Sequence, residues 1–91
     1  IKIKKYGAVS KEVCNEMLLS LKKISKSNLC ITTTGIAGPS GGTRHKPVGT
    51  VYIGIKYNKK TIIKKSLYSG SRRVVQNKTI KDIFIIIDSL I

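Results

Sequence analysis

Residues 34–50 contain the side chains of this 91-residue chain that are best suited to binding or chemistry. Five of the eight glycines and both prolines fall between Gly35 and Gly49. Glycine loses the most backbone entropy on folding, so such a cluster indicates positive φ angles or a close approach to a ligand. Hydroxyl and basic side chains accompany it, namely Thr34, Ser40, Thr43, Arg44 and Lys46. Together they predict a site for an anionic, phosphate-bearing small molecule.

The spacing of this glycine-rich loop excludes two well-known phosphate loops. A Walker A motif requires Lys and then Ser or Thr directly after a glycine, but Gly42 is followed by Thr43 and Arg44. The G-x-G-x-x-G spacing of dinucleotide folds is also absent, and those loops open a helix. A nest of backbone N–H groups is the remaining way to hold phosphate. The alternative is an ordinary connection, although loops of this length are often functional.

No local sequence pattern indicates a nucleophilic catalytic site or a metal site. There is no G-x-S-x-G elbow, and a single histidine, His45, with Cys14 and Cys30 gives too few ligands in zinc spacing. We expect both cysteines to be small buried side chains, His45 to be solvated, and no cofactor to be needed. The four carboxylates fall on expected helices and serve there as helix charges. They are Glu12, Glu16, Asp82 and Asp88.

Five elements must position these residues. Ser10 can cap a helix over 11–26, in which apolar residues recur at helical spacing. These are Val13, Cys14, Met17, Leu18, Leu21 and Ile24. Strands are expected over 29–34, 50–57 and 61–68, because β-branched and alternating apolar residues dominate there, and the last two strands predict a β-hairpin. Gly54 inside its strand indicates a close approach by another backbone.

The last element is a helix over 72–90. Its apolar stripe consists of Ile80, Ile83, Phe84, Ile87 and Ile91. Because β-branched residues are mediocre helix formers, a strand over 83–87 is the alternative. The order helix, strand, loop, strand, strand, helix predicts the α/β class, with helices covering a mixed sheet.

The net charge of +14 has two interpretations. One is a nucleic-acid-binding surface. The other is compositional bias, because lysine and isoleucine each occur 15 times, the chain has three arginines, and the lysines are scattered over every segment. Bias is the preferred interpretation, since nucleic-acid surfaces favour arginine for bidentate contacts. No apolar run reaches membrane-spanning length, so we expect no membrane partner and a cytoplasmic location.

Five motifs appear in order along the chain: YGAVS at 6–10, TGIAGP at 34–39, GGT at 41–43, KPVGTVYI at 46–53 and GSR at 70–72. With them the chain resembles the CinA C-terminal domain family, the nicotinamide-nucleotide amidohydrolases, over essentially its whole length. The resemblance implies hydrolysis of the carboxamide of nicotinamide mononucleotide to nicotinate mononucleotide and ammonia. It implies a three-layer α/β/α domain, often dimeric, of which residues 1–91 form the C-terminal part.

The resemblance also implies which residues bind substrate. We expect six loop residues to line or shape the site, namely Thr34, Gly35, Ala37, Gly38, Gly41 and Gly42. Arg72 is the expected charged contact to the phosphate, with Thr43 and Lys46 as further candidates.

The sequence departs from the family pattern at its start. The family's presumed nucleophilic serine, in a Glu-Ser-Cys-Thr-Gly-Gly-like segment, and its Tyr and Lys activators lie upstream of the first motif, and none maps onto this sequence. We therefore expect no catalytic residue here and no activity of the chain alone. Its expected partners are a ligand like nicotinamide mononucleotide and a missing N-terminal half or a second copy. The alternatives are half of a split enzyme and a basic nucleic-acid-binding module.

Overall fold

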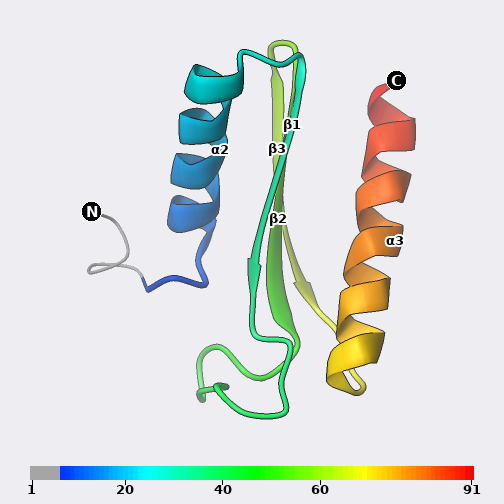
Figure 1. Ribbon diagram of the computed structural model, residues 1–91. Coiled ribbons are helices and arrows are strands. Elements are labelled where there is room, and N and C mark those ends of the chain that lie inside the picture. Colours follow the sequence, from blue (N-terminus) through cyan, green and yellow to red (C-terminus); the bar gives the residue numbers. More distant parts are fainter. Residues whose placement is uncertain (1–6) are drawn as a thin grey trace.

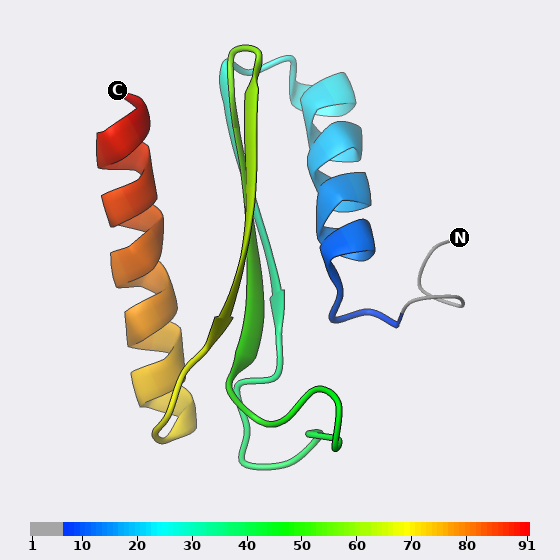
Figure 2. The same ribbon diagram turned by 180° about the vertical axis from the view of Figure 1, so that it is seen from behind.

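In the computed structural model, which describes residues 7–91, a three-stranded sheet lies between two helices. The elements are α2 (Lys11–Ser25), β1 (Leu29–Gly35), β2 (Thr50–Tyr57), β3 (Lys60–Leu67) and α3 (Arg72–Leu90). Figure 1 shows α2 against one face of the sheet and α3 against the other, and Figure 2 shows the same layers from behind. The predicted α/β class, with a β-hairpin and two flanking helices, is confirmed.

The predicted mixed pairing differs from the structure. The described strands follow the order β1-β2-β3, and both neighbouring pairs are antiparallel. Parallel neighbours need a long crossover, usually a helix. The segment 36–49 between β1 and β2 contains no helix, and a tight turn at Asn58 and Lys59 joins β2 to β3. Each strand therefore returns beside the previous one in the opposite direction.

Helix α2 begins and ends at residues suited to those positions. The N–H of Val13 donates to Ser10 Oγ at 3.1 Å, and the Ser10 hydroxyl donates to the Gly7 carbonyl at 2.9 Å. At the other end Lys26 adopts φ 56°, and its N–H bonds the Lys22 carbonyl. A left-handed residue of this kind commonly ends a helix, so α2 is one residue shorter than predicted.

The sheet covers a narrower row of α2 than the sequence indicated. Val13, Cys14 and Leu18 are buried, but Met17 is 40% and Ile24 82% exposed. The predicted apolar stripe therefore extends beyond the buried residues, whereas the predicted burial of Cys14 and Cys30 is confirmed.

Gly54 of β2 lies in close contact with side chains of α2 and β1. A Cβ atom at Gly54 would lie 2.9 Å from Cys14 Sγ and 2.8 Å from Thr32 Oγ1. The sequence predicted a close approach by a backbone, and the structure shows an approach by side chains of α2 and β1 instead. On the opposite face of β2, Val51, Ile53 and Ile55 form a core cluster with the α3 residues Val75 and Ile86.

Helix α3 is continuous from 72 to 90, so the alternative strand over 83–87 does not form. Of the predicted stripe, Ile83 and Ile87 pack against the core, but Ile80, Phe84 and Ile91 are 53%, 67% and 79% exposed. The helix is apolar around much of its circumference, so its pattern did not define the buried side. Within residues 7–91, no helix combines the length and apolar character that a membrane span requires.

A polar contact helps to set the rotation of α3 about its own axis. The Tyr68 hydroxyl, just after β3, donates to Asp82 Oδ2 at 2.5 Å, and Lys64 Nζ lies 3.6 Å from the same oxygen. These contacts hold the Asp82 side of α3 against β3. Val75 and Ile86 then face β2, and the Ile80 and Phe84 side turns outward.

Candidate functional site

The glycine-rich loop over 36–49 is ordered by its own hydrogen bonds. At its base, the Ile36 N–H donates to the Thr50 carbonyl at 2.9 Å, and the Gly49 N–H donates to the Ile36 carbonyl at 2.6 Å. The Thr50 hydroxyl donates to the Pro47 carbonyl at 2.7 Å. These hydrogen bonds give the loop a defined conformation and hold its outer residues in place.

The outer part of the loop closes on itself between Thr43 and Lys46. The Thr43 N–H donates to the Lys46 carbonyl at 2.8 Å, and the Lys46 N–H donates to Thr43 Oγ1 at 3.0 Å. Thr43 is a predicted ligand contact, and its hydroxyl also stabilises the outer part of the loop. Arg44 and His45 lie exposed between them, as expected for His45.

The conformation of the loop itself requires glycine at several positions. Gly38, Gly41 and Gly49 adopt φ angles of 91°, 96° and 97°, which residues with a Cβ rarely adopt. At Gly42 a Cβ would lie 2.6 Å from the backbone nitrogen of Val48. The positive φ angles expected from the sequence are present, and tight packing within the loop explains Gly42 without a ligand.

Arg72 joins the loop to α3. Its Nη1 donates to the Gly38 carbonyl at 3.2 Å, and the side chain is otherwise exposed. Arg72 is the first residue of α3, and Ser71 caps the helix by accepting the Val74 N–H at 3.3 Å. Figures 1 and 2 place the loop and the start of α3 at the same end of the sheet. A helix N-terminus carries partial positive charge, so this end of the molecule is suited to an anion.

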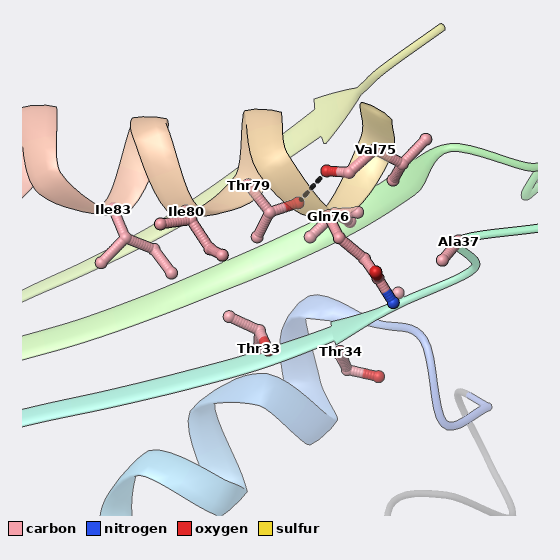
Figure 3. Close-up of a pocket in the computed structure, with 10 residues that line it drawn as sticks. Thr33, Thr34, Ala37, Val75, Gln76, Thr79, Ile80 and Ile83 are labelled. Carbon is pink, nitrogen blue, oxygen red and sulfur yellow. Dashed lines mark hydrogen bonds between the residues drawn. The ribbon is translucent and has the colours of Figure 1, made fainter. Parts of the chain in front are cut away.

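A groove of about 390 Å³ opens between β1 and α3. Three residues of the predicted site, Thr34, Gly35 and Ala37, line it where β1 meets the loop. In Figure 3 the Gln76 side chain reaches from α3 toward β1 near Ala37. The rest of the lining comes from β1, β2 and α3, namely Thr33, Val51, Val75, Thr79, Ile80 and Ile83. Apart from Gln76 and the three threonines, this lining is mainly apolar.

The nine predicted binding residues fall into two neighbouring groups. Thr34, Gly35 and Ala37 line the groove, and Arg72 with Gly38 lies beside its loop end. The other four belong to the outer loop and do not line the groove; they are Gly41, Gly42, Thr43 and Lys46.

Thr34 and Lys46 also contact the segment that precedes α2. The Thr34 hydroxyl donates to the Ala8 carbonyl at 2.8 Å. A Cβ at Gly7 would lie 3.3 Å from Lys46 Nζ. The YGAVS and TGIAGP motifs, far apart in the sequence, therefore meet at one end of the sheet.

The sequence interpretation missed the contribution of α3 to the groove. Gln76, Thr79, Ile80 and Ile83 follow the spacing i, i+3, i+4, i+7, so they share one side of the helix. That spacing was the available signal. The sequence interpretation placed Ile80 and Ile83 in the apolar stripe of the helix and made no prediction for Gln76 and Thr79.

In the described part of the chain, Cys14 and Tyr68 have a displaced pKa, and neither lines the groove. Burial on the sheet-facing side of α2 raises the pKa of the Cys14 thiol, and a hydrogen bond with the Thr32 hydroxyl partly opposes this rise. Burial and the neighbouring Asp82 raise the pKa of Tyr68. A raised pKa leaves a thiol or phenol protonated and weakly nucleophilic. Cys14 and Tyr68 therefore do not supply the groove with an activated nucleophile.

Comparison with known protein families and curated proteins gives one consistent result. Residues 2–91 match the CinA C-terminal domain. A competence-damage inducible protein of Clostridium botulinum (strain Loch Maree / Type A3) is 51% identical over 78 residues, which are 86% of this chain and 19% of that protein. A protein of the same description from Clostridioides difficile (strain 630) is 44% identical over 81 residues, covering 89% of this chain and 19% of the relative.

Solved structures agree with this match. The competence/damage inducible protein CihA from Agrobacterium tumefaciens superimposes with a TM-score of 0.92 at 27% identity, over 98% of this chain and 55% of that chain. A CinA superfamily protein from Enterobacter cloacae gives a TM-score of 0.80 at 30% identity, over 88% and 47% of the two chains. This chain thus spans about half of these solved chains and about a fifth of the curated relatives.

Proposed function

Because this chain belongs to the CinA C-terminal domain family, we propose that it forms the glycine-loop wall of an amidohydrolase site for nicotinamide mononucleotide. In the proposed reaction, water attacks the carboxamide carbon and the C–N bond breaks. Ammonia and nicotinate mononucleotide are the products. Such a hydrolase belongs to cytoplasmic salvage of NAD, where pyridine nucleotides are recycled. The family resemblance carries the choice of reaction and substrate.

The contact between Arg72 and Gly38 carries the proposal for the phosphate. A guanidinium has five N–H donors in a planar fork that matches phosphate oxygens. Arg72 gives one donor to the Gly38 carbonyl at 3.2 Å, and this bond holds the fork at the mouth of the loop. The start of α3 adds partial positive charge at the same place. The phosphate would thus lie between the loop and the first turn of α3.

The remaining predicted residues would shape the site around that phosphate. Thr34, Gly35 and Ala37 lie where the groove reaches the loop, so they would contact the rest of the ligand. The outer turn between Thr43 and Lys46 holds the loop in shape and places the basic Lys46 side chain beside Gly7.

The catalytic group would come from a different segment. By the family resemblance, a serine with Tyr and Lys activators does the chemistry, and none of the three maps onto residues 1–91. A hydroxyl without an activating base is a weak nucleophile. We therefore propose that residues 1–91 alone bind the nucleotide without hydrolysing it, and that they act when the catalytic segment of the domain is present.

Calorimetric titration of the chain with nicotinamide mononucleotide and with nicotinamide riboside, which lacks the phosphate, tests the binding proposal. We expect the mononucleotide to bind more tightly. Arg72→Ala should weaken its binding about tenfold or more, since hydrogen bonds to charged groups contribute about 1.5–3 kcal/mol. Arg73→Ala is the matched control, because Arg73 is the exposed neighbouring arginine, and it should leave binding unchanged.

Two results would contradict the proposal. Equal loss of affinity in the Arg72 and Arg73 variants would show that positive charge in general, and not the fork at the loop, attracts the ligand. Release of ammonia from nicotinamide mononucleotide by residues 1–91 alone would show that a catalytic group lies within this chain.

A further inference from the structure

The β2–β3 hairpin concentrates positive charge at one end of the sheet. Five of the 15 lysines fall between residues 56 and 65, and that segment contains no acidic residue. They are Lys56, Lys59, Lys60, Lys64 and Lys65. All four acidic residues of the chain lie on α2 and α3. Compositional bias would explain the number of lysines, but the fold determines where they gather.

Of these five lysines, Lys64 is the one with an acidic partner among residues 7–91. Its Nζ lies 3.6 Å from Asp82 Oδ2, and the side chain is still 47% exposed. Lys59 and Lys60 lie exposed at the turn and the start of β3. An anion that binds at the turn would therefore meet ammonium groups that no carboxylate of the described chain neutralises.

A hollow of about 370 Å³ opens at the turn itself. It is lined by Tyr57, Asn58, Lys59 and Lys60. The Asn58 N–H donates to the Asn28 carbonyl at 2.9 Å, which fixes the turn against the start of β1. Tyr57 is half-buried, and Lys60 is its partner in the register of the hairpin. An aromatic ring and two basic side chains thus share one open and ordered site.

This hollow is separate from the candidate site for the mononucleotide. Figures 1 and 2 place the β2–β3 turn at the end of the sheet opposite to the glycine-rich loop. None of the four residues that line the hollow lines the groove between β1 and α3. The hollow therefore needs an occupant of its own.

We propose that the hairpin turn and the lysines of β3 form a binding surface for single-stranded nucleic acid. Such surfaces combine aromatic side chains, on which bases stack, with a basic track that follows the phosphates. Tyr57 would stack on a base, and Lys59 and Lys60 would contact the adjoining phosphates. Lys64 lies four residues further along β3, about 13 Å from Lys60, and would extend the track.

The type of basic residue indicates binding without sequence preference. Bidentate recognition of bases and phosphates favours arginine, and the segment 56–65 contains none. A lysine ammonium is a point charge that attracts phosphate without demanding a fixed orientation. The surface therefore suits the backbone and stacked bases of a flexible strand better than the base edges of a duplex.

Other anionic partners fit the turn less well. A membrane surface requires exposed apolar side chains beside the basic ones, but the residues exposed at the turn are polar, namely Asn58, Lys59 and Lys60. An acidic polypeptide would pair with the lysines but would leave the aromatic ring without a stacking partner. Both are included in the test.

Fluorescence anisotropy of residues 1–91 with a labelled oligothymidylate of about 12 nucleotides tests the proposal. The duplex of the same sequence is measured in parallel, and polyphosphate, polyglutamate and phosphatidylserine vesicles serve as competitors. We expect the single strand to bind most tightly. A plot of log K against log salt concentration should have a slope of about −2, because three phosphate contacts contribute about 0.7 each.

Two pairs of variants locate the binding surface. Lys59→Gln combined with Lys60→Gln removes both charges of the hollow. The matched control, Lys11→Gln combined with Lys81→Gln, removes two exposed lysines from the helices. Tyr57→Leu removes the aromatic face but keeps an apolar side chain, and Tyr57→Phe is its control because it keeps the ring.

We expect the combined Lys59 and Lys60 variant to reduce the magnitude of the salt slope by about 1.4, and the helix variant to leave the slope unchanged. Tyr57→Leu should weaken binding at least about fivefold, as expected for the loss of one stacked base, and Tyr57→Phe should stay within about twofold. If Tyr57→Leu fails to fold by circular dichroism, the two lysine variants decide the question.

Several results would overturn the proposal. Equal losses in the hairpin and helix lysine variants would show that overall charge attracts the strand. Unchanged binding in a folded Tyr57→Leu variant, or a duplex that binds as tightly as the single strand, would show that no base stacks at the turn. Absence of binding would exclude the surface, and stronger competition by polyglutamate or by vesicles would assign it to an acidic protein or an anionic membrane.

Discussion

Replacement of Gly54 by alanine tests how tightly α2 is seated on the sheet. The added Cβ would lie 2.9 Å from Cys14 Sγ and 2.8 Å from Thr32 Oγ1. Favourable contacts between such heavy atoms need about 3.5–4.0 Å, so both neighbours must move by roughly 0.6 Å or more. Cys14 is fully buried and Thr32 nearly so, which leaves little room for that movement.

The expected size of the effect follows from two opposing contributions. Overpacking of a close-packed core destabilises by about 1–3 kcal/mol. Alanine also restricts the unfolded chain relative to glycine, which stabilises by about 0.4–1 kcal/mol. We therefore expect Gly54→Ala to lower the free energy of unfolding by about 1–2 kcal/mol, or the Tm by roughly 5–15 °C in a domain of this size.

The assay is denaturant unfolding at low protein concentration, followed by circular dichroism, with Cys14→Ala as the second arm of a double-mutant cycle. Cys14→Ala alone leaves a small cavity beneath α2. In the double variant the new methyl group at Gly54 occupies part of that space. The two changes should therefore offset each other by about 1 kcal/mol, within the range known for contacting residues.

Additive effects of the two substitutions, within about 0.5 kcal/mol, would refute this reasoning. They would show that the methyl group at Gly54 and the Cys14 sulfur do not compete for the same space. A Gly54→Ala variant more stable than the parent would refute it as well, because α2 would then have room to move away from the sheet.

Two other substitutions test local contacts. Ser10→Ala should lower the free energy of unfolding by about 1–2 kcal/mol, because its buried hydroxyl caps α2; Ser20→Ala, on the exposed side of α2, is the control, and equal losses in denaturant unfolding would contradict the cap. Burial and Asp82 raise the pKa of Tyr68, so the fold favours the protonated phenol, and stability present below pH about 10 is lost as the pH rises through the folded pKa. Tyr68→Phe should flatten that alkaline loss, leaving the part due to Cys14, whose pKa is also raised; an unchanged pH profile would exclude Tyr68.

Local signals in the sequence were sufficient for most of the elements. The strand over 50–57 and the helix over 72–90 have the predicted bounds, because strand alternation and helical spacing are properties of neighbouring residues. The side of α3 that faces the sheet was not predictable in this way. It depends on contacts between different elements, namely the packing of Val75 and Ile86 on β2 and the hydrogen bond between Tyr68 and Asp82. The exposed position of Phe84 therefore appeared only in the structure.

The same distinction applies to the candidate site. The glycine-rich loop was recognisable from composition and from its family motifs, since those residues are consecutive. Gln76 and Thr79 were not, because they enter the groove only when α3 packs across β2 beside β1. The antiparallel pairing of β1 with β2 was likewise missed, because it depends on how the loop over 36–49 folds back.

The difference between the two strand connections has a consequence for the order of folding. β2 and β3 are joined at Asn58 and Lys59, with Asn58 at φ 55°, whereas β1 and β2 must close the whole loop over 36–49. Closing a longer loop loses more chain entropy, and short hairpins form in about 1–10 μs. We expect the β2–β3 hairpin to form early and the β1–β2 pairing, which shapes the ligand loop, to form late. Substitutions in the loop should therefore act mainly on the unfolding rate, so the lifetime of the folded state would depend most on the residues assigned to binding.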